Sequence, residues 1–448
     1  MPRGYSKASA VGMTKSLGFW RCWALVVGSM IGNGIFMLPA VLAPYGSLSL
    51  LGWVCSGAGT LLLAFTFGRL ARRLPKLGGP YAYVQSTFGD APGFMVGWGH
   101  WISYFVASAA AAVAFVGYLG FFFPALSDSA MLSALTGVGL IWLMTGINIS
   151  GVQSAGVIQL VTTLLKLLPL FAVAGGGFLL ADVTDVPATN PDNESLPTLI
   201  AGLVMITMWA YVGIENVTIP ADDVIEPRKT IPRALVVGAI SATVVYVIAT
   251  MGVMALVPQA QLVESTSPFA DAAVGIVGDW GASVVAVGAL ISIVGALNGN
   301  ILATGMLGRA IALDALFPKR FENLNDAGAP VSSLVVSSIL ASLFIGMNYT
   351  RGLVAAFEML ILLSTLTTLL PYALAALAEI VLQYRDKAQG IDVSRVGLVV
   401  AIGALLFSLF AIVGSGLEIA AYGCVLLLAG IPVYLLTGRR RRALRAAS

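Results

Sequence analysis

Long apolar stretches alternate with short polar ones along the chain, and about twelve of them could cross a lipid bilayer, which takes roughly 20 apolar residues in a helix. Of the 448 residues, 58% are apolar and 10% are charged, so a water-facing globule could not bury the apolar surface. We therefore predict an all-α integral membrane protein. The expected spans lie near residues 18–44, 48–72, 92–124, 130–150, 154–181, 197–220, 232–257, 280–313, 330–348, 353–383, 396–414 and 416–437.

Lysine and arginine residues gather in alternate connections between the expected spans. They lie before the first span, after the second, sixth, eighth and tenth, and in the tail, whereas the opposite connections contain only Arg351. Because basic connections stay in the cytoplasm, both termini are predicted to be cytoplasmic. We expect residues 1–17 to form a cytoplasmic N-terminus and residues 438–448 a basic cytoplasmic tail. The expected location is a plasma membrane, namely a bacterial inner membrane.

Two of the expected spans are interrupted. The first contains GSMIGNGIF (residues 28–36), with three glycines and an asparagine, and the sixth contains WAYVGIENV (residues 209–217), with a glycine, a carboxylate and an asparagine. An unpaired backbone group in hydrocarbon costs several kcal/mol, so a broken helix must be buried in protein or line a wet cavity. Close helix packing is the alternative explanation for the glycines.

The two interruptions lie five spans apart, and an odd offset inserts the two halves with opposite orientation. Paired interruptions at matching places indicate a transporter built from inverted repeats. The predicted repeats are residues 18–181 and 197–383, and two further spans follow within residues 394–437.

Each break exposes backbone groups that could bind a substrate. Amides near Gly32, Asn33 and Gly34, with the positive end of a helix dipole behind them, suit a carboxylate. Carbonyls at Met30 and in residues 209–212, which include Trp209 and Val212, suit an ammonium group. Facing breaks of this kind would recognise the part that all α-amino acids share.

Four further motifs are specific to one superfamily of transporters: LGGPYAYVQSTFG (residues 77–89), IEPRKTIPRA (225–234), SPFADAA (267–273) and LFPKRFENLNDAGAPV (316–331). With these motifs the chain resembles the amino acid/polyamine/organocation superfamily, and most closely its basic amino acid/polyamine antiporters of the arginine/agmatine branch. The resemblance covers essentially the whole chain. It implies the leucine-transporter fold with a 5+5 inverted repeat and broken helices 1 and 6. It also implies a homodimer that exchanges amino acids or their amines by alternating access.

The resemblance extends to single residues of the site. Trp209 matches the aromatic residue that covers the substrate in the arginine/agmatine antiporter. Glu215 and Tyr372 match a gating carboxylate and an aromatic residue of the same gate, and Ser364 matches a pocket hydroxyl. The alternative for Glu215 is a carboxylate that only caps the second half-helix of the sixth span.

Other positions depart from that pattern. Where this chain has Ser108, Ala111 and Asn300, the antiporter has an asparagine, a methionine and a tryptophan. The resemblance therefore implies an altered side-chain pocket. His100 replaces a gate tyrosine, with a hydrogen-bonded core histidine as the alternative. An uncharged pocket with aromatic faces can still hold a cation.

Lys166 lies in the middle of the fifth expected span. A lysine at the bilayer centre costs about 2.5–3.5 kcal/mol on insertion scales, so it normally faces protein. It could carry a proton, or brace the first break as a fixed strut, as the resemblance to other superfamily members implies. A lysine that snorkels to the interface is a third explanation. Proton-coupled uptake of neutral amino acids through Lys166 is therefore the alternative to exchange.

Groups for other chemistry are few. The chain has one histidine, which cannot form a metal site alone, and no G-x-x-x-x-G-K-[ST] phosphate loop. Glu358 either lines an outer vestibule or pairs with Arg351. We expect no enzyme activity, no cofactor, no metal and no nucleic-acid partner. The expected partners are a small amino acid or amine, the lipid bilayer, a second copy of the chain and, if Lys166 titrates, protons.

Overall fold

The computed structural model describes residues 17–32, 35–74, 79–151, 170–218, 224–348, 351–391, 393–438 and 440. Within these residues the regular elements are all helices, and the only β contacts are two isolated bridges. The predicted all-α class is confirmed for this part of the chain.

Nine helical segments of the described residues are long and apolar enough to cross a membrane. They correspond to nine of the expected spans. Where the fifth and ninth spans were expected, the structure has shorter apolar helices at Leu170–Leu180 and Val331–Met347. The first expected span is divided, because one helix ends at Met30 and the next begins at Leu38. The total of about 12 spans stays a prediction.

The long helices give the bundle its frame, and short helices connect them. The long ones are α1 (Phe19–Met30), α3 (Ser49–Arg73), α5 (Asp90–Gly120), α7 (Ala130–Ile149), α9 (Leu196–Met208), α10 (Pro227–Leu256), α12 (Pro268–Leu313), α13 (Val331–Asn348), α14 (Leu353–Ala388), α15 (Arg395–Val413) and α16 (Gly416–Leu428). The short ones are α2 (Leu38–Leu42), α4 (Pro80–Phe88), α6 (Ala125–Asp128), α11 (Gln259–Leu262) and α17 (Gly430–Leu436). The 3₁₀ turns of the described residues include η1 (Ala43–Tyr45), η2 (Val183–Asp185), η3 (Trp209–Tyr211), η4 (Ile214–Thr218) and η6 (Lys319–Glu322).

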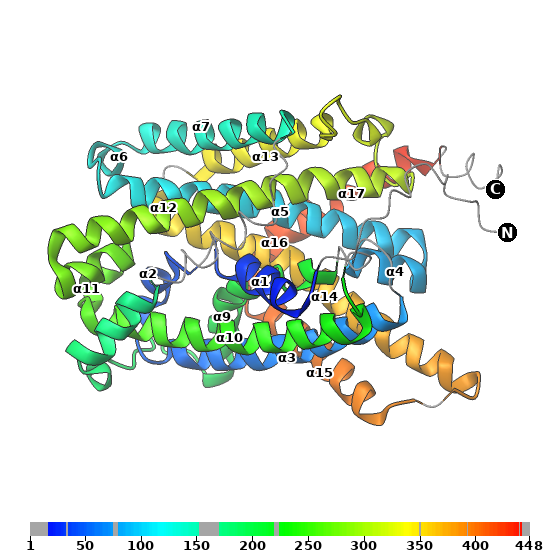
Figure 1. Cartoon of the computed structure of the whole chain (residues 1–448), viewed down its shortest axis with the longest axis horizontal. Helices are drawn as coiled ribbons and strands as arrows, with labels where there is room; N and C mark the ends of the chain where they lie inside the picture. Colours follow the sequence, from blue (N-terminus) through cyan, green and yellow to red (C-terminus); the bar gives the residue numbers. More distant parts are fainter. Residues whose placement is uncertain are drawn as a thin grey trace.

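Helix α5 runs through the middle of the bundle (Figure 1). It packs against α12 on one side and α14 on the other, and nearly all of its residues are buried. Its sequence explains this position, because a helix that is apolar all round is stable only inside a protein or a membrane. A run of small residues at 107–112 also lets neighbouring backbones approach closely.

Two layers enclose this centre in Figure 1, with α7 and α13 on one side and α3 and α10 on the other. Helix α1 packs against α10. Helix α12 would be too long for one span at 46 residues, but its backbone bends at Gly278, where φ is +71°. The bend lies next to the expected start of the eighth span at residue 280.

Candidate functional site

A cavity of about 170 Å³ lies where α1, α5, α12 and the irregular segment after α9 meet. Larger cavities of about 340 and 530 Å³ lie elsewhere. We take the smaller one as the candidate site because both sequence interruptions contribute to its wall. Its lining includes Ser29 and Met30 of α1, Tyr104 and Ala107 of α5, and Gly295, Gly299 and Asn300 of α12.

Helix α1 ends at the cavity. Met30 is its last residue and is buried in the cavity wall. The amide of Ile31 donates to Val27 at 2.8 Å, and the amide of Gly32 donates to the Met30 carbonyl at 3.0 Å. In this conformation the Gly32 amide is therefore engaged by the chain itself. Asn33 and Gly34, the other residues predicted to hold a carboxylate, lie outside the described residues.

The segment after α9 forms the facing wall. Helix α9 passes into η3 at Trp209, Val212 is extended, and Gly213 has a φ of +99° before η4 begins. A positive φ of this size is easily adopted only by glycine, which explains the residue type at this turn. The Ser29 hydroxyl donates to the Gly213 carbonyl at 3.0 Å, so α1 is tied to this turn.

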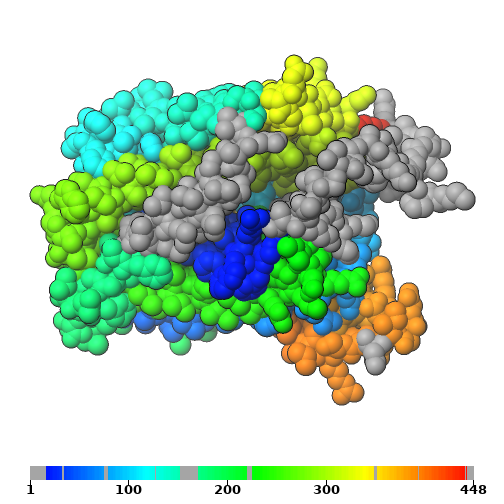
Figure 2. All heavy atoms as spheres, in the orientation of Figure 1, coloured from blue at the N-terminus to red at the C-terminus, as the bar shows by residue number. Residues whose placement is uncertain are grey.

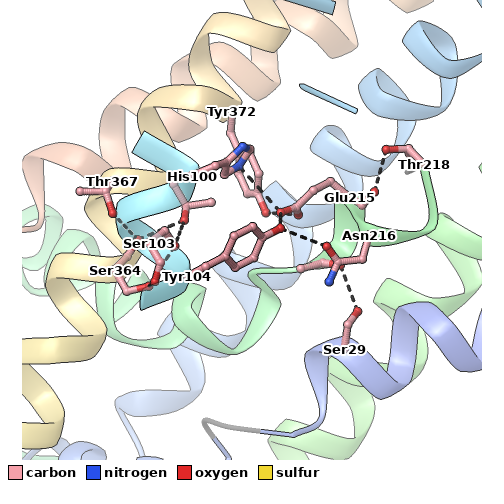
Figure 3. A network of polar contacts seen from close by, with 12 residues as sticks. Ser29, His100, Ser103, Tyr104, Glu215, Asn216, Thr218, Ser364, Thr367 and Tyr372 are labelled. Atoms are coloured by element: carbon pink, nitrogen blue, oxygen red, sulfur yellow. Dashed lines mark hydrogen bonds and ion pairs between the residues drawn. The ribbon is translucent and has the colours of Figure 1, made fainter. Parts of the chain in front are cut away.

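A network of polar side chains lies beside the cavity (Figure 3). The Tyr372 hydroxyl donates to Oε2 of Glu215 at 2.5 Å. The Tyr104 hydroxyl lies 3.2 Å from Oδ1 of Asn216 and 3.5 Å from Oε1 of Glu215. Nε2 of His100 lies 3.8 Å from the same carboxylate oxygen, too far for a hydrogen bond. The buried carboxylate thus joins η4 to α5 and α14.

A second polar cluster joins α5 to α14 by hydroxyl groups. The Ser364 hydroxyl donates to the Ser103 carbonyl at 3.0 Å, and the Thr368 hydroxyl donates to Oγ of Ser103 at 2.5 Å. Figure 3 shows Ser103 and Ser364 close together on the far side of Tyr104 from Asn216. Ser364 is fully buried and is not part of the cavity wall.

The predicted pocket residues therefore fall into three groups. The cavity wall contains Met30, Trp209, Val212 and Asn300. The wall does not contain Gly32, Ser108, Ala111 or Ser364, all of which are buried. Asn33, Gly34 and Lys166 lie outside the described residues. The roles of all these residues stay predictions.

The structure also separates the alternatives for Glu358. Arg351 pairs with Glu418 at 3.4 Å, not with Glu358. Glu358 is half-buried and lines a cavity of about 370 Å³ together with Tyr45 and Glu194. The vestibule alternative stays a prediction.

Sequence reasoning missed several residues of the cavity wall, and those with polar side chains are Ser29, Tyr104 and Asn216. Tyr104 lies four residues after His100, so the two side chains share one face of α5 and their rings stack at 6.2 Å. That spacing was a usable signal. Ser29 and Asn216 lie inside the two interrupted motifs, in which the prediction assigned binding to backbone groups of neighbouring residues.

Two nitrogen donors of the cavity wall have no hydrogen-bond partner among the described residues. Nε1 of Trp209 and Nδ2 of Asn300 are buried, and neither donates a hydrogen bond to any described residue. A buried donor without a partner costs about 1–3 kcal/mol. The two N–H groups are therefore available for an oxygen atom of a bound molecule. Within the described ranges, no group of three or more His, Cys, Asp or Glu residues could hold a metal ion.

A bundle of apolar helices whose irregular segments meet at a cavity with a few polar side chains in its wall has the architecture of a secondary transporter. The sequence comparison agrees with this class. Residues 17–420 match the family of amino acid permeases, and the chain belongs to this family.

Three relatives cover nearly the whole chain. The putative arginine/ornithine antiporter of Bacillus subtilis (strain 168) is 31% identical and aligns over 94% of this chain and 97% of its own. The putrescine transporter PotE of Escherichia coli (strain K12) is 26% identical and aligns over 95% of this chain and 97% of its own. The cadaverine/lysine antiporter of the same strain is 28% identical and aligns over 91% of this chain and 91% of its own. The predicted superfamily is confirmed. The chain is a multi-pass membrane transporter of amino acids or amines and not an enzyme.

Replacing Trp209 with alanine should weaken substrate binding. The indole is 4% exposed, forms part of the cavity wall and could cover a bound substrate. Loss of its ring contact should raise the apparent KM about 5- to 10-fold, and phenylalanine should restore part of it. Trp280→Ala is the matched control, since Trp280 is 78% exposed. Equal KM values for Trp209→Ala and the unsubstituted protein would remove Trp209 from the site.

Proposed function

We propose that the protein exchanges amino acids, or an amino acid and an amine, across a bacterial inner membrane by alternating access. The observation that carries the proposal is the meeting of the two interrupted segments at one cavity, with Met30 on one side and residues 209–213 on the other. The relatives named as antiporters of arginine, ornithine, cadaverine and lysine support it. In this proposal, residues 18–181 and 197–383 are inverted repeats with broken helices 1 and 6. The termini are cytoplasmic, and the protein is a homodimer.

The cavity suits a substrate with a cationic side chain and a carboxylate. No charged side chain is among its described lining residues, so a cation there would lie against the aromatic rings of Trp209 and Tyr104. Glu215 lies next to Tyr104 and adds a negative charge close to the cavity. The free donors on Trp209 and Asn300 suit a carboxylate oxygen. Basic amino acids and the diamines named for the relatives share the cation.

Counterflow in liposomes tests the proposed exchange. The purified protein would be reconstituted with internal arginine, ornithine, lysine, putrescine, agmatine or alanine, and uptake of each labelled compound would be measured at two pH values. We expect saturable uptake that depends on an internal substrate. Linear, non-saturating uptake would indicate a channel, and uptake into empty liposomes would exclude obligate exchange.

Asn300→Trp should change which substrate is preferred. Asn300 lies in the cavity wall on α12, so a larger side chain there would reduce the space for the substrate's side chain. The ranking of substrates in the counterflow panel should shift without loss of all transport. Leu302→Trp is the control, because Leu302 is 39% exposed on the same helix. An unchanged ranking would show that Asn300 does not contact the substrate.

Lys166 keeps proton-coupled uptake of neutral amino acids as a second candidate, on the sequence observation of a lysine in the middle of a span. If Lys166 carries the proton, Lys166→Ala should abolish accumulation driven by a pH gradient and leave some exchange. If it is a strut, both modes should slow alike. A variant that equals the unsubstituted protein in both modes would assign Lys166 neither role.

A further inference from the structure

A cleft of about 530 Å³ opens between α3, α10 and α15, away from the candidate transport site. It lies where α3 ends and where α10 and α15 begin, which is the end of the bundle where basic residues gather. In Figure 1 α15 lies beside α3 at the lower edge of the bundle, and in Figure 2 the orange atoms of this region project next to the green atoms of α10. We propose that this cleft binds one anionic phospholipid.

The greater part of the cleft is apolar. Phe65, Val237 and Val396 line it, and their side chains are 48%, 41% and 74% exposed. On a chain that spans a bilayer, such side chains face hydrocarbon. Val236 and Val400 extend the apolar surface inward. An apolar surface of this kind suits the acyl chain of a lipid.

The remaining part is cationic. Arg69, Arg72 and Arg233 line the cleft, and no acidic residue of the described chain is among its lining residues. Arg72 and Arg233 are exposed, and neither forms an ion pair or a side-chain hydrogen bond with any described residue. Two arginines without an ion-pair partner among the described residues, at the end of an apolar cleft, match the phosphate of a lipid headgroup.

Arg69, the third arginine of the cleft, is fixed by a buried carboxylate. Nε of Arg69 donates to Oε1 of Glu379 at 2.8 Å, and this carboxylate is fully buried. The Arg69 guanidinium lies directly against Gly397 of α15, where any side chain would collide with it. Gly397 therefore lets α15 approach while the guanidinium forms the floor of the cleft. Arg73 also pairs with Glu379, and it pairs with Asp386 at 2.8 Å. Both carboxylates near Arg69 are therefore neutralised by arginines.

The N-terminus of α15 also favours an anionic headgroup in the cleft. Helix α15 has 19 residues, and its N-cap Ser394 lies in the cleft wall and accepts the Gly397 amide at 3.1 Å. The positive end of this helix dipole therefore points toward the cationic end of the cleft. A free phosphate would use only this end, whereas a phospholipid also covers Phe65 and the valines. The apolar lining thus favours the lipid.

Native mass spectrometry of the full-length protein in detergent tests this inference. The protein would be incubated with dioleoyl phosphatidylglycerol or dioleoyl phosphatidylcholine, with and without excess inorganic phosphate. We expect one phosphatidylglycerol per chain to be retained in preference to phosphatidylcholine, and phosphate not to displace it. Removing two cations in Arg72→Gln/Arg233→Gln should weaken this binding about 30-fold, since each basic residue near an anionic surface contributes about 5-fold.

Two further variants make the test specific. Lys319→Gln/Arg320→Gln removes two exposed charges of η6 outside the cleft, and it should leave lipid binding unchanged. Val400→Trp fills the apolar part and should lower lipid retention although the arginines remain. The melting temperature without lipid and the counterflow rate check that each variant is folded.

Several results would overturn the inference. Equal retention of the two lipids would mean a groove without headgroup selectivity, and displacement by phosphate would mean a site for soluble anions. A dimer that dissociates in Arg72→Gln/Arg233→Gln would assign the cleft to a second copy of the chain. Unchanged binding in that variant would place the lipid elsewhere.

Discussion

Gly213→Val is expected to eliminate transport. Gly213 has a φ of +99° and lies in the cavity wall. A β-branched residue with positive φ costs about 1–3 kcal/mol in backbone strain. A Cβ there would also lie 3.2 Å from Nδ2 of Asn216 and 3.4 Å from Cβ of Ser29. The strain and the crowding both act at the turn that faces the end of α1, so counterflow should fall about 100-fold.

A glycine of a helix away from the cavity is the control for this substitution. An added Cβ at Gly146 of α7 would meet nothing within 4 Å, so Gly146→Val should transport at a rate close to that of the unsubstituted protein. Gly213→Ala should be intermediate, because it carries the strain with less bulk. The melting temperature in detergent shows whether each variant is folded. Normal counterflow in a folded Gly213→Val would show that this turn is not part of the transport site.

Glu215→Leu is expected to impair both stability and transport. The carboxylate is 1% exposed and accepts the Tyr372 hydroxyl at 2.5 Å. Leucine would leave this buried hydroxyl without its acceptor, at a cost of about 1–3 kcal/mol. It would also release η4 from α14, so counterflow should fall at least about 10-fold. Thermal unfolding in detergent and counterflow in liposomes measure the two effects.

Glu215→Gln separates the structural role of this residue from its charge. The amide oxygen can still accept from Tyr372, so most of the stability should return. If transport stays low, the negative charge beside the cavity is what the substrate or the gate requires. If transport returns with stability, Glu215 acts only as a cap of η4. If Glu215→Leu has the same melting temperature and the same counterflow rate as the unsubstituted protein, both the structural role and the role of the charge are excluded.

The class of protein and the placement of most spans could be predicted from the sequence. Nine long apolar helices of the described chain lie where spans were expected, for example α5 near residues 92–124 and α10 near residues 232–257. A bilayer imposes a length and a polarity on each crossing, and both can be counted along the chain. The two motifs that predict interruptions could be found for the same reason, since asparagine and glutamate are rare at that depth.

The contents of the site were less predictable. Ser364 was expected beside the substrate, but in the structure its hydroxyl bonds to Ser103 outside the cavity wall. Tyr104 was not expected, yet it lines the cavity and links Asn216 with Glu215. Which face of α5 or α14 meets the cavity depends on the rotation of each helix, and a sequence in which every face is apolar does not specify that rotation.

The sequence by itself determined that the chain crosses a membrane many times, and it predicts that two crossings are interrupted and that the basic ends lie on one side. Only the tertiary structure decided that Glu215 meets Tyr104, 111 residues away, and Tyr372, 157 residues away. It also decided that Arg69 is held by Glu379, 310 residues away, beside a cleft that Arg72 and Arg233 also line. The physical reason is that insertion depends on each segment's own hydrophobicity. Packing in lipid depends instead on the shapes and hydrogen bonds of segments far apart in the chain.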